Sequence, residues 1–343
     1  MNEAPVIASA DMTGMTGMKC IIRVSAEDCT GCGNCAEVCP GNKRNDVLKM
    51  VSYQEGHRQQ NMFEYGKEKA VPLAVLEKFP DGTVKGSQFR QPLFEFSGAC
   101  GGCGETPYAK LMTQLFGERM MIANATGCSS IWGGSFPATP YTVNSEGRGP
   151  AWANSLFEDN AEFGFGMWLG HRANQGKVVS VVKELLAITD REELRPVLQE
   201  YLNTLENGEP NGVAVRKMID MLEKSTVEGE EEKNFVQQIL SGRDFAAKKS
   251  QWIVGGDGWA YDIGFGGLDH VLASGEDVNI LVFDTEVYSN TGGQASKSTP
   301  LGAVAQFAAG GKKVRKKDLA AIAMTYKDVY VAQVAQELTA IRW

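Results

Sequence analysis

Four cysteines near the beginning of the chain restrict its fold more than any other feature of the sequence. Their spacing is C-x2-C-x2-C-x3-C-P. Three thiolates at intervals of two residues can wrap one [4Fe–4S] cluster, while the chain turns at the proline and directs the fourth thiolate elsewhere. Zinc sites rarely use this triple spacing, so the pattern predicts an iron–sulfur module. The members of this four-cysteine run are Cys29, Cys32, Cys35 and Cys39.

The run also implies a partner. In two-cluster modules with this spacing, each run lends its fourth cysteine to the other cluster, and the printed sequence contains one such run. We therefore expect the partner run either upstream of Met1 or on another chain. Cys20 is an alternative ligand, but the stretch 19–24 alternates like a strand, which favours a packed thiol.

Length, charge and composition exclude several classes of protein. The 343 residues fit about two domains, and the net charge of -8 argues against a nucleic-acid partner. Residues 1–19 lack the basic start and the apolar core of a secretory signal, and no stretch is apolar enough to span a membrane. We therefore expect a cytoplasmic protein whose eight cysteines are ligands or free thiols rather than disulfides.

A second set of cysteines lies among glycines. Cys100 and Cys103 form a CxxC, and Cys128 follows a predicted strand. A CxxC alone fits a redox dithiol, a zinc site or a cluster. The glycines favour a cluster, because donation from backbone N–H groups to sulfur needs close approach of the backbone. The fourth ligand is expected beyond Trp343, since no cysteine follows Cys128 in the printed sequence.

From Pro72 onward the sequence alternates between strand and helix patterns, which predicts a layered α/β domain. The clearest unit is a βαβ unit, and its ligands are expected at the carboxyl ends of its strands. Its parts are a strand at 251–254, a helix at 260–272 and a strand at 278–283. The other expected elements are a helix at 106–115, a buried strand at 120–123, an ordered surface loop at 132–152, helices at 161–186 and 192–205, a solvated acidic run at 228–232, a strand at 329–334 and an unfinished element at the end of the chain.

Two loops of the βαβ unit carry candidate cofactor ligands. Gly256, Asp257 and Gly258 stand between the first strand and the helix, where Asp257 can bind a divalent metal and helix N–H groups can face a diphosphate. The next strand ends in the stretch 284–293, which offers carboxylate, hydroxyl, amide and carbonyl oxygens of the kind that Mg²⁺ prefers. The spacing from this GDG to Asn290 resembles the thiamine-diphosphate motif, and ordinary glycine turns are the alternative.

Taken in this order, these elements resemble the C-terminal half of the pyruvate:ferredoxin oxidoreductases, over essentially the whole chain. The stretches 98–108, 125–130 and 288–294 carry the resemblance together with the cysteines. It implies a thiamine-diphosphate-binding α/β fold over 74–343, with a mostly parallel sheet flanked by helices. A partial ferredoxin-like [4Fe–4S] module over 1–73 would precede it.

The resemblance also implies an activity and its partners. The expected reaction is oxidative decarboxylation of pyruvate with coenzyme A to acetyl-CoA and CO₂, in anaerobic metabolism. Electrons would pass through [4Fe–4S] clusters to ferredoxin or flavodoxin. The full-length enzyme is expected to be a homodimer.

The resemblance assigns roles to residues by position. The four-cysteine run would serve two outer clusters, and Cys100, Cys103 and Cys128 would hold the cluster nearest thiamine. Mg²⁺ would be bound by Asp257, Thr285 and the carbonyl of Val287. Asn290 would stand close to the reacting centre. The residues expected to line the cofactor are Glu105, Cys128, Gly256, Asp257, Gly258, Trp259, Thr285, Glu286, Val287, Tyr288, Ser289 and Asn290.

Parts of the family pattern are missing from the printed sequence. The glutamate that activates thiamine belongs to an N-terminal domain of the family, and the first ferredoxin-type run and the fourth ligand of the inner cluster are missing too. We therefore expect this chain alone to be catalytically incomplete. The alternatives are an oxidoreductase for another 2-oxoacid, a ferredoxin-type electron carrier without catalysis, and a non-redox thiamine lyase, which would not need eight cysteines.

One dense basic run remains to be interpreted. Its members could steer an acidic ferredoxin or a coenzyme A phosphate, and a solvated loop is the alternative. The histidines His57, His171 and His270 are scattered, and we assign them no chemistry. The basic residues are Lys312, Lys313, Arg315, Lys316 and Lys317.

Overall fold

The structure, a computed structural model, divides into two compact units, 1–115 and 116–343. The domain boundary predicted at 73/74 falls inside the first unit and stays a prediction. Within the described ranges, no helix is both long and apolar enough to cross a membrane. The described residues are 9–41, 47–67, 69–135, 139–225 and 229–335.

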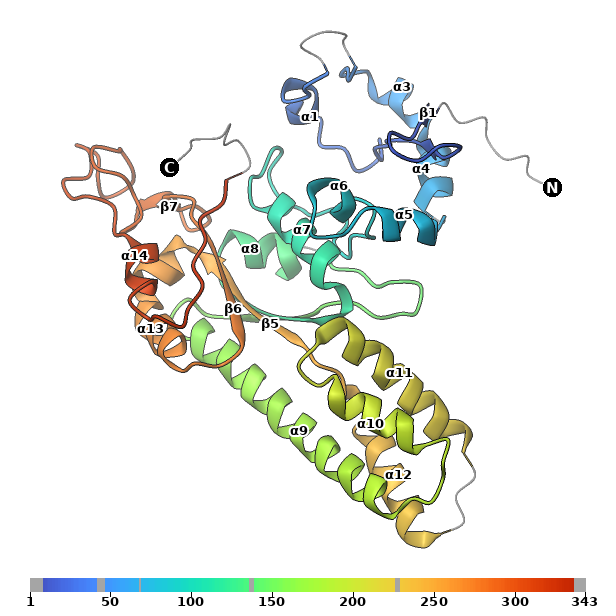
Figure 1. Ribbon diagram of the computed structural model, residues 1–343. Helices are drawn as coiled ribbons and strands as arrows, with labels where there is room; N and C mark the ends of the chain where they lie inside the picture. Colours follow the sequence, from blue (N-terminus) through green and yellow to red (C-terminus); the bar gives the residue numbers. More distant parts are fainter. Residues whose placement is uncertain (1–8, 42–46, 68, 136–138, 226–228, 336–343) are drawn as a thin grey trace. The chain divides into compact units, whose positions relative to one another are not determined.

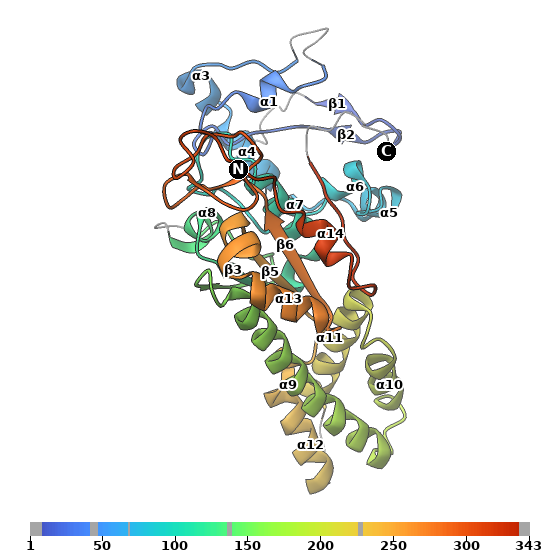
Figure 2. The ribbon, with the colours of Figure 1, turned by 90° about the vertical axis from the view of Figure 1, so that its left-hand side faces the viewer.

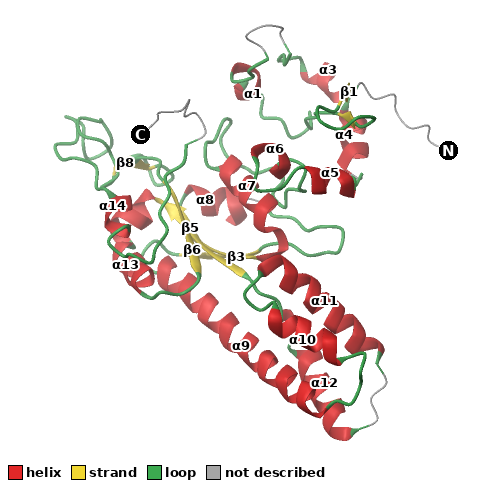
Figure 3. Cartoon of the chain, in the orientation of Figure 1, coloured by secondary structure: helices red, strands yellow, loops and turns green. Residues whose placement is uncertain are grey.

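The first unit consists mainly of short helices and loops (Figure 3). Its strands β1 (Ala10–Asp11) and β2 (Lys19–Cys20) pair antiparallel. Cys20 therefore lies in a strand as expected, but this strand covers only the first two residues of the stretch 19–24. Its helices are α1 (Asn34–Glu37), α3 (Tyr53–His57), α4 (Gln60–Lys67), α5 (Leu73–Lys78), α6 (Val84–Ser87) and α7 (Thr106–Phe116), which ends one residue beyond the unit.

Two buried glutamines tie the loops of the first unit to its helices. Gln60, at the start of α4, accepts a hydrogen bond from the N–H of Ala26 at 2.9 Å. Gln114, in α7, donates to the carbonyls of Ser87 at 3.1 Å and Arg90 at 3.0 Å. Since buried polar groups need partners, these bonds fix the segment that leads into the four-cysteine run and the segment between α6 and α7.

One parallel sheet forms the centre of the second unit. Its strands are β3 (Met120–Ala125), β4 (Ala151–Ser155), β5 (Ser250–Gly256) and β6 (Val278–Phe283), in the order β4-β3-β5-β6. The two middle strands, β3 and β5, are largely buried apolar runs, as expected for parallel strands covered on both faces. After β4 the chain crosses to the other side of β3, so the strand order reverses between β3 and β5.

The helices between β4 and β5 form an arm that projects from the sheet in two perpendicular views (Figures 1 and 2). They are α9 (Asn160–Ile188), α10 (Arg195–Asn203), α11 (Gly208–Lys224) and α12 (Glu230–Ser241). Their facing sides share a core of fully buried side chains, among them Leu185, Leu198, Met218 and Ile239. The arm therefore has apolar packing of its own, and α9 joins it to the sheet.

The beginning of α9 lies directly on the sheet at Gly164. A Cβ added there would be 2.6 Å from Ile253 Cγ1 and 2.9 Å from Ala123 Cβ, whereas one added at Gly166 would meet nothing within 4 Å. We expect Gly164→Ala to lower the free energy of unfolding by about 1–3 kcal/mol through overpacking. Gly166→Ala should raise it by up to about 1 kcal/mol through helix propensity. Urea unfolding of both variants measures this difference, and shifts of equal sign and size would contradict it.

The chain after β5 surrounds the carboxyl edge of the sheet. β5 passes into the π-helical turn η4 (Gly258–Ile263) and then into α13 (Phe265–Ala273) before β6. A hairpin of β7 (Val287–Tyr288) and β8 (Gln294–Ala295) follows β6, and α14 (Leu319–Ala323) adds Leu319 to the core around Trp259 and Leu268. The remaining short elements are η1 (Gly117–Arg119), α8 (Cys128–Ser130), η2 (Ile131–Ser135) and η3 (Arg243–Phe245).

The predicted α/β class with a parallel sheet is confirmed. α10 begins three residues later than expected, with Pro196 in its first turn, where the missing N–H of proline is not needed. Glu230, Glu231 and Glu232 occupy the first turn of α12, where Glu230 and Glu231 are exposed to solvent as expected. Five further elements are found where the sequence predicts them. The predicted helices are α7 (expected at 106–115) and α9 (161–186), and the predicted strands are β3 (120–123), β5 (251–254) and β6 (278–283).

Three expectations are wrong. The stretch 132–152 does not begin as a surface loop, because η2 buries Trp132 at 3% exposure. The helix expected at 260–272 is interrupted at Gly264, where a Cβ would lie 2.3 Å from the ring of Trp259. Residues 329–335 form no strand, since a strand needs a neighbour and the described residues there pair with none. The unfinished element expected at the chain end falls in 336–343, outside the described residues.

Candidate functional site

The carboxyl ends of β3 and β5 lie side by side, at the place where the strand order reverses. β3 leads through Gly127 to Cys128, and β5 leads directly to Asp257. The short helix α8, which begins at Cys128, contacts β5, and Asn124 Nδ2 donates to Ser129 Oγ at 2.7 Å. A cysteine and a buried carboxylate therefore occupy neighbouring strand ends, where open parallel sheets bind their ligands.

Asp257 is 1% exposed and faces hydroxyl groups. Thr285 Oγ1 donates to Oδ1 at 2.9 Å, and Ser298 Oγ donates to Oδ2 at 3.0 Å. Burial raises the pKa of Asp257, and the hydroxyl hydrogen bonds only partly oppose this effect. In the part of the chain that the structure describes, no lysine or arginine pairs with this carboxylate. A buried carboxylate without a countercharge is costly, so a bound cation fits this position.

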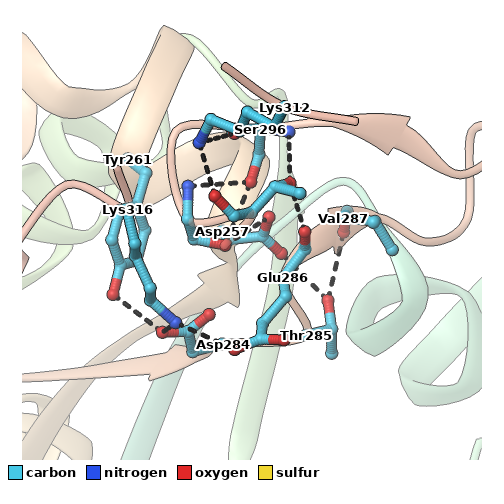
Figure 4. Close-up of polar contacts among 11 residues, drawn as sticks. Asp257, Tyr261, Asp284, Thr285, Glu286, Val287, Ser296, Lys312 and Lys316 are labelled. Carbon is cyan, nitrogen blue, oxygen red and sulfur yellow. Dashed lines mark hydrogen bonds and ion pairs between the residues drawn. The ribbon is translucent and has the colours of Figure 1, made fainter. Parts of the chain in front are cut away.

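Oxygens of three kinds converge beside this carboxylate (Figure 4). Thr285 Oγ1 lies 2.9 Å from Asp257 Oδ1 and 3.2 Å from the carbonyl oxygen of Val287. Ser289 Oγ lies 2.9 Å from Thr285 Oγ1. Mg²⁺ prefers octahedral oxygen coordination and is often held by one or two carboxylates together with substrate phosphates. The carboxylate, the hydroxyl and the carbonyl have the chemistry of such a site.

The turn between β6 and β7 has an unusual backbone. Glu286 has a φ of 65°, in the left-handed region that residues other than glycine rarely adopt. Its carbonyl accepts a hydrogen bond from Thr299 Oγ1, and its carboxylate lies 3.4 Å from Lys316 Nζ. With this turn, the hydroxyl of Thr285 and the carbonyl of Val287 join the same oxygen cluster.

Glycines on both sides of Asp257 permit close packing. A Cβ at Gly255 would be 2.7 Å from Ala125 Cβ, and one at Gly258 would be 2.5 Å from the ring of Tyr288. Trp259 is 1% exposed in the core, and its Nε1 has no hydrogen-bond partner among the described residues. Tyr288 therefore rests on the GDG backbone, while Trp259 supports this loop from the core.

The β7–β8 hairpin carries Asn290 in its exposed turn. The N–H of Gly293 donates to the carbonyl of Tyr288 at 2.8 Å and closes this turn. Gly292 and Gly293 have φ values of 142° and 76°, which explains the two glycines at these positions. Asn290 is thus presented on the hairpin that begins at the oxygen cluster.

The cysteines of the first unit lie on two loops that approach each other. A Cβ built at Gly101, inside the CxxC, would be 3.5 Å from Cys32 Cβ, and one at Gly102 would be 3.0 Å from Asn34 Nδ2. The N–H of Cys103 donates to the carbonyl of Cys100 at 3.0 Å and forms a tight turn. The structure therefore brings the CxxC loop next to the four-cysteine run.

The residues predicted to hold the inner cluster are divided between the two units. Among the described residues, no group of three or more His, Cys, Asp or Glu side chains is arranged to hold a metal ion. Cys128 and Asp257 belong to the second unit, whereas Cys100, Cys103 and the buried Glu105 belong to the first. The chemistry of the donors fits iron–sulfur ligation, because the described cysteines form no disulfide and are half-exposed or exposed.

Known proteins and family models match both units of the chain. Residues 22–42 match the model of the 4Fe-4S binding domain, and residues 239–341 match that of the thiamine pyrophosphate enzyme, C-terminal TPP binding domain. The chain is 56% identical to the pyruvate-flavodoxin oxidoreductase of Klebsiella pneumoniae over 92% of its own length and 26% of the relative. It is 54% identical to the pyruvate:ferredoxin oxidoreductase of Moorella thermoacetica over 93% of its own length and 27% of the relative.

Over 92–93% of its own length, the chain is thus a relative of part of the pyruvate:ferredoxin and pyruvate-flavodoxin oxidoreductases. It spans about a quarter of the length of these two relatives, at 26% and 27%. A further relative, the pyruvate dehydrogenase [NADP(+)] of Cryptosporidium parvum, is 49% identical over 92% of the chain and 18% of the relative. The resemblance found in the motifs is confirmed, and so are the thiamine-diphosphate-binding domain and the iron–sulfur-binding module.

The site also contains residues that the sequence did not single out. Ser298 and Thr299 are 0% and 1% exposed, and both turn their hydroxyls to the oxygen cluster. Ser298 contacts a residue 41 positions away, which no local pattern reveals. The sequence feature that could have indicated these two residues is the hydroxyl-rich stretch 296–299, which follows the hairpin directly.

Proposed function

We propose that the chain is the thiamine-diphosphate and electron-transfer part of an enzyme that oxidatively decarboxylates pyruvate to acetyl-CoA and CO₂. Electrons would pass through [4Fe–4S] clusters to ferredoxin or flavodoxin. The position of Cys128 and Asp257 at neighbouring ends of β3 and β5 carries this proposal. A cluster ligand beside a diphosphate site suits oxidation in one-electron steps, and the names of the relatives support pyruvate and both acceptors.

The metal is proposed to be Mg²⁺, held by Asp257, the hydroxyl of Thr285 and the carbonyl of Val287. The buried carboxylate of Asp257, to which the described residues offer no countercharge, supports this assignment. When bound, thiamine diphosphate supplies the electron sink for loss of CO₂ from a 2-oxoacid. The chain would hold its diphosphate through the metal and the loops 256–259 and 285–290, with Asn290 at the reacting centre.

The clusters are proposed to use the cysteines in two groups. The four-cysteine run would serve the outer clusters, and Cys100, Cys103 and Cys128 would bind the cluster nearest the thiamine cofactor, beside Glu105. In metal-dependent modules, the free energy of metal binding contributes directly to folding. We therefore expect the four-cysteine run to close around its cluster when iron and sulfide are supplied.

The full-length enzyme is proposed to be a cytoplasmic homodimer that uses coenzyme A as acceptor of the acetyl group. Residues outside this sequence would complete it, namely the glutamate that activates thiamine, the first ferredoxin-type run and the fourth ligand of the inner cluster. This division of parts follows from the family pattern, and for that reason activity is to be tested on the full-length enzyme.

The substrate is tested by an anaerobic assay of the full-length enzyme with ferredoxin or flavodoxin as acceptor. We expect reduction of the acceptor to require both pyruvate and coenzyme A. Omission of coenzyme A should slow turnover by at least about tenfold, because the acetyl group then has no acceptor. Faster reduction with 2-oxoglutarate than with pyruvate would contradict the proposed substrate and favour an oxidoreductase for another 2-oxoacid.

A further inference from the structure

The basic run 312–317 is largely turned inward. Lys312 Nζ donates to the carbonyls of Ser296 at 2.8 Å and Thr299 at 2.6 Å. Lys316 pairs with two carboxylates (Figure 4), and Lys317 Nζ donates to the carbonyl of Tyr261 at 3.0 Å. Three of the five basic side chains are therefore engaged within the second unit, which leaves little of this run for an acidic partner.

The other two basic side chains of the run point into solvent. Lys313 and Arg315 are exposed, and the described residues offer no partner to either side chain. The run therefore contains inward-facing and outward-facing cations within six positions of sequence. This contrast supplies a matched control, since Lys313 and Lys316 have the same chemistry and differ in their contacts.

Each inward lysine ends on a segment that also contacts the oxygen cluster around Asp257. The segment bound by Lys312 holds Ser298, which donates to Asp257 Oδ2 at 3.0 Å. The segment bound by Lys317 is η4, which begins directly after Asp257. The segment bound by Lys316 carries Thr285, which lies 2.9 Å from Asp257 Oδ1. The run 312–317 thus contacts three segments that meet at the carboxylate of Asp257.

Lys316 has the most specific contacts of the three. Its Nζ lies 2.6 Å from Asp284 Oδ2 and 3.4 Å from Glu286 Oε1, on either side of Thr285. Tyr261 Oη also donates to Asp284 Oδ2 at 2.8 Å. Burial and the nearby Asp284 raise the pKa of Tyr261, so the phenol stays protonated and remains a donor.

The contacts of Lys316 reduce the repulsion between carboxylates and stabilise an unfavourable backbone conformation. Asp284 and Glu286 would repel each other and the carboxylate of Asp257, and a half-buried ammonium group between the first two reduces that repulsion. Glu286 also holds a left-handed backbone conformation, which persists only where surrounding contacts fix it. Lys316 and the hydroxyl of Thr299 are contacts of this kind.

We propose that Lys312, Lys316 and Lys317 together hold the segments around Asp257 in place, and we call these three residues the internal clamp. Within it, Lys316 is a positioning residue that holds the 284–287 turn in the conformation needed for metal binding. The clamp deepens the function proposed above and rests on it. Lys316 does not touch the metal or the cofactor in this scheme. It acts through Asp284 and Glu286, which fix the turn that presents Thr285 and Val287.

The test compares three variants of the full chain: Lys316→Met, Lys316→Arg and the control Lys313→Met. Mn²⁺ is the probe, and its binding in the presence of thiamine diphosphate is followed from the EPR signal of the free ion. We expect Lys316→Met to raise the Kd for Mn²⁺ by about tenfold. Lys316→Arg should stay within about threefold of wild type, and Lys313→Met should not change the Kd.

Amide hydrogen exchange of residues 284–299 without metal provides a second readout. Exchange should accelerate by about tenfold in Lys316→Met and stay unchanged in Lys313→Met, because opening of this segment is eased only when the clamp is broken. Unchanged exchange in Lys316→Met would overturn the clamp, as would an unchanged Kd. If Lys316→Met exchanges faster than wild type but wild type binds no Mn²⁺, the proposed metal function fails, and Lys316 keeps only its structural role of holding the turn.

Discussion

Asp257→Asn is expected to abolish Mg²⁺-dependent binding of thiamine diphosphate while the fold stays intact. The side chain keeps its size, so the hydroxyls of Thr285 and Ser298 keep a partner. The metal loses its carboxylate ligand. Removing one charge from a buried ion pair costs about 3–5 kcal/mol, which corresponds to at least about a hundredfold in Kd. Calorimetry of the full chain with Mg²⁺ and thiamine diphosphate measures this loss.

Stability without metal should move in the opposite direction. A carboxyl group whose pKa is raised by the fold binds protons more tightly in the folded than in the unfolded state. Its charge therefore opposes folding at neutral pH. Asp257→Asn should accordingly leave the free energy of unfolding without metal unchanged or higher. Asp277→Asn is the control at the opposite end of the sheet, since Asp277 directly precedes β6. Equal cofactor affinities for both variants would contradict the site.

Cys32→Ala is expected to remove one iron–sulfur cluster from the anaerobically reconstituted full-length enzyme. Cys32 is the middle thiolate of the three that the spacing assigns to a single cluster, and such a cluster holds four irons. The variant should therefore contain about four fewer iron and four fewer sulfide ions per chain. Electron transfer from pyruvate to ferredoxin should fall by at least about a hundredfold, because an interrupted relay has no other route. Iron and sulfide analysis with a reduction assay measures both effects.

Cys20→Ala is the control for this prediction. Cys20 lies in β2 opposite Ala10, outside the four-cysteine run. Its replacement should leave the iron content and the reduction rate within about twofold of wild type. Loss of the same amount of iron in both variants would show that Cys20 is a ligand, and retention of all iron in Cys32→Ala would contradict the module.

The sequence predicted those parts of the fold that local patterns determine. The strands β5 and β6 were recognisable because each is a short, largely apolar run bounded by glycine or polar residues. The stretch 329–334 has the same composition, yet it forms no strand. Tyr330 is 92% exposed there, and no neighbouring strand is present among the described residues. Strand formation depends on a partner that propensity cannot report.

Tertiary contacts explain what the sequence missed near the candidate site. The break at Gly264 arises because the ring of Trp259 occupies the space of a side chain. Ser298 reaches Asp257 across a separation that depends on the hairpin fold. The basic run had the composition of a solvated loop, and only its contacts reveal that Lys316 faces inward. In contrast, the GDG loop was predictable, because a strand end fixes its position without long-range information.

We expect the metal site at Asp257 and the cluster held partly by Cys128 to share one end of the sheet. Mn²⁺ in place of Mg²⁺ tests this in the dithionite-reduced full-length enzyme, because a bound paramagnetic ion speeds spin relaxation of a nearby cluster. We predict that Mn²⁺ speeds the relaxation of one cluster signal far more than that of the others, and that Asp257→Asn removes the effect. Identical relaxation of all cluster signals with Mn²⁺ and with Mg²⁺ would contradict the claim.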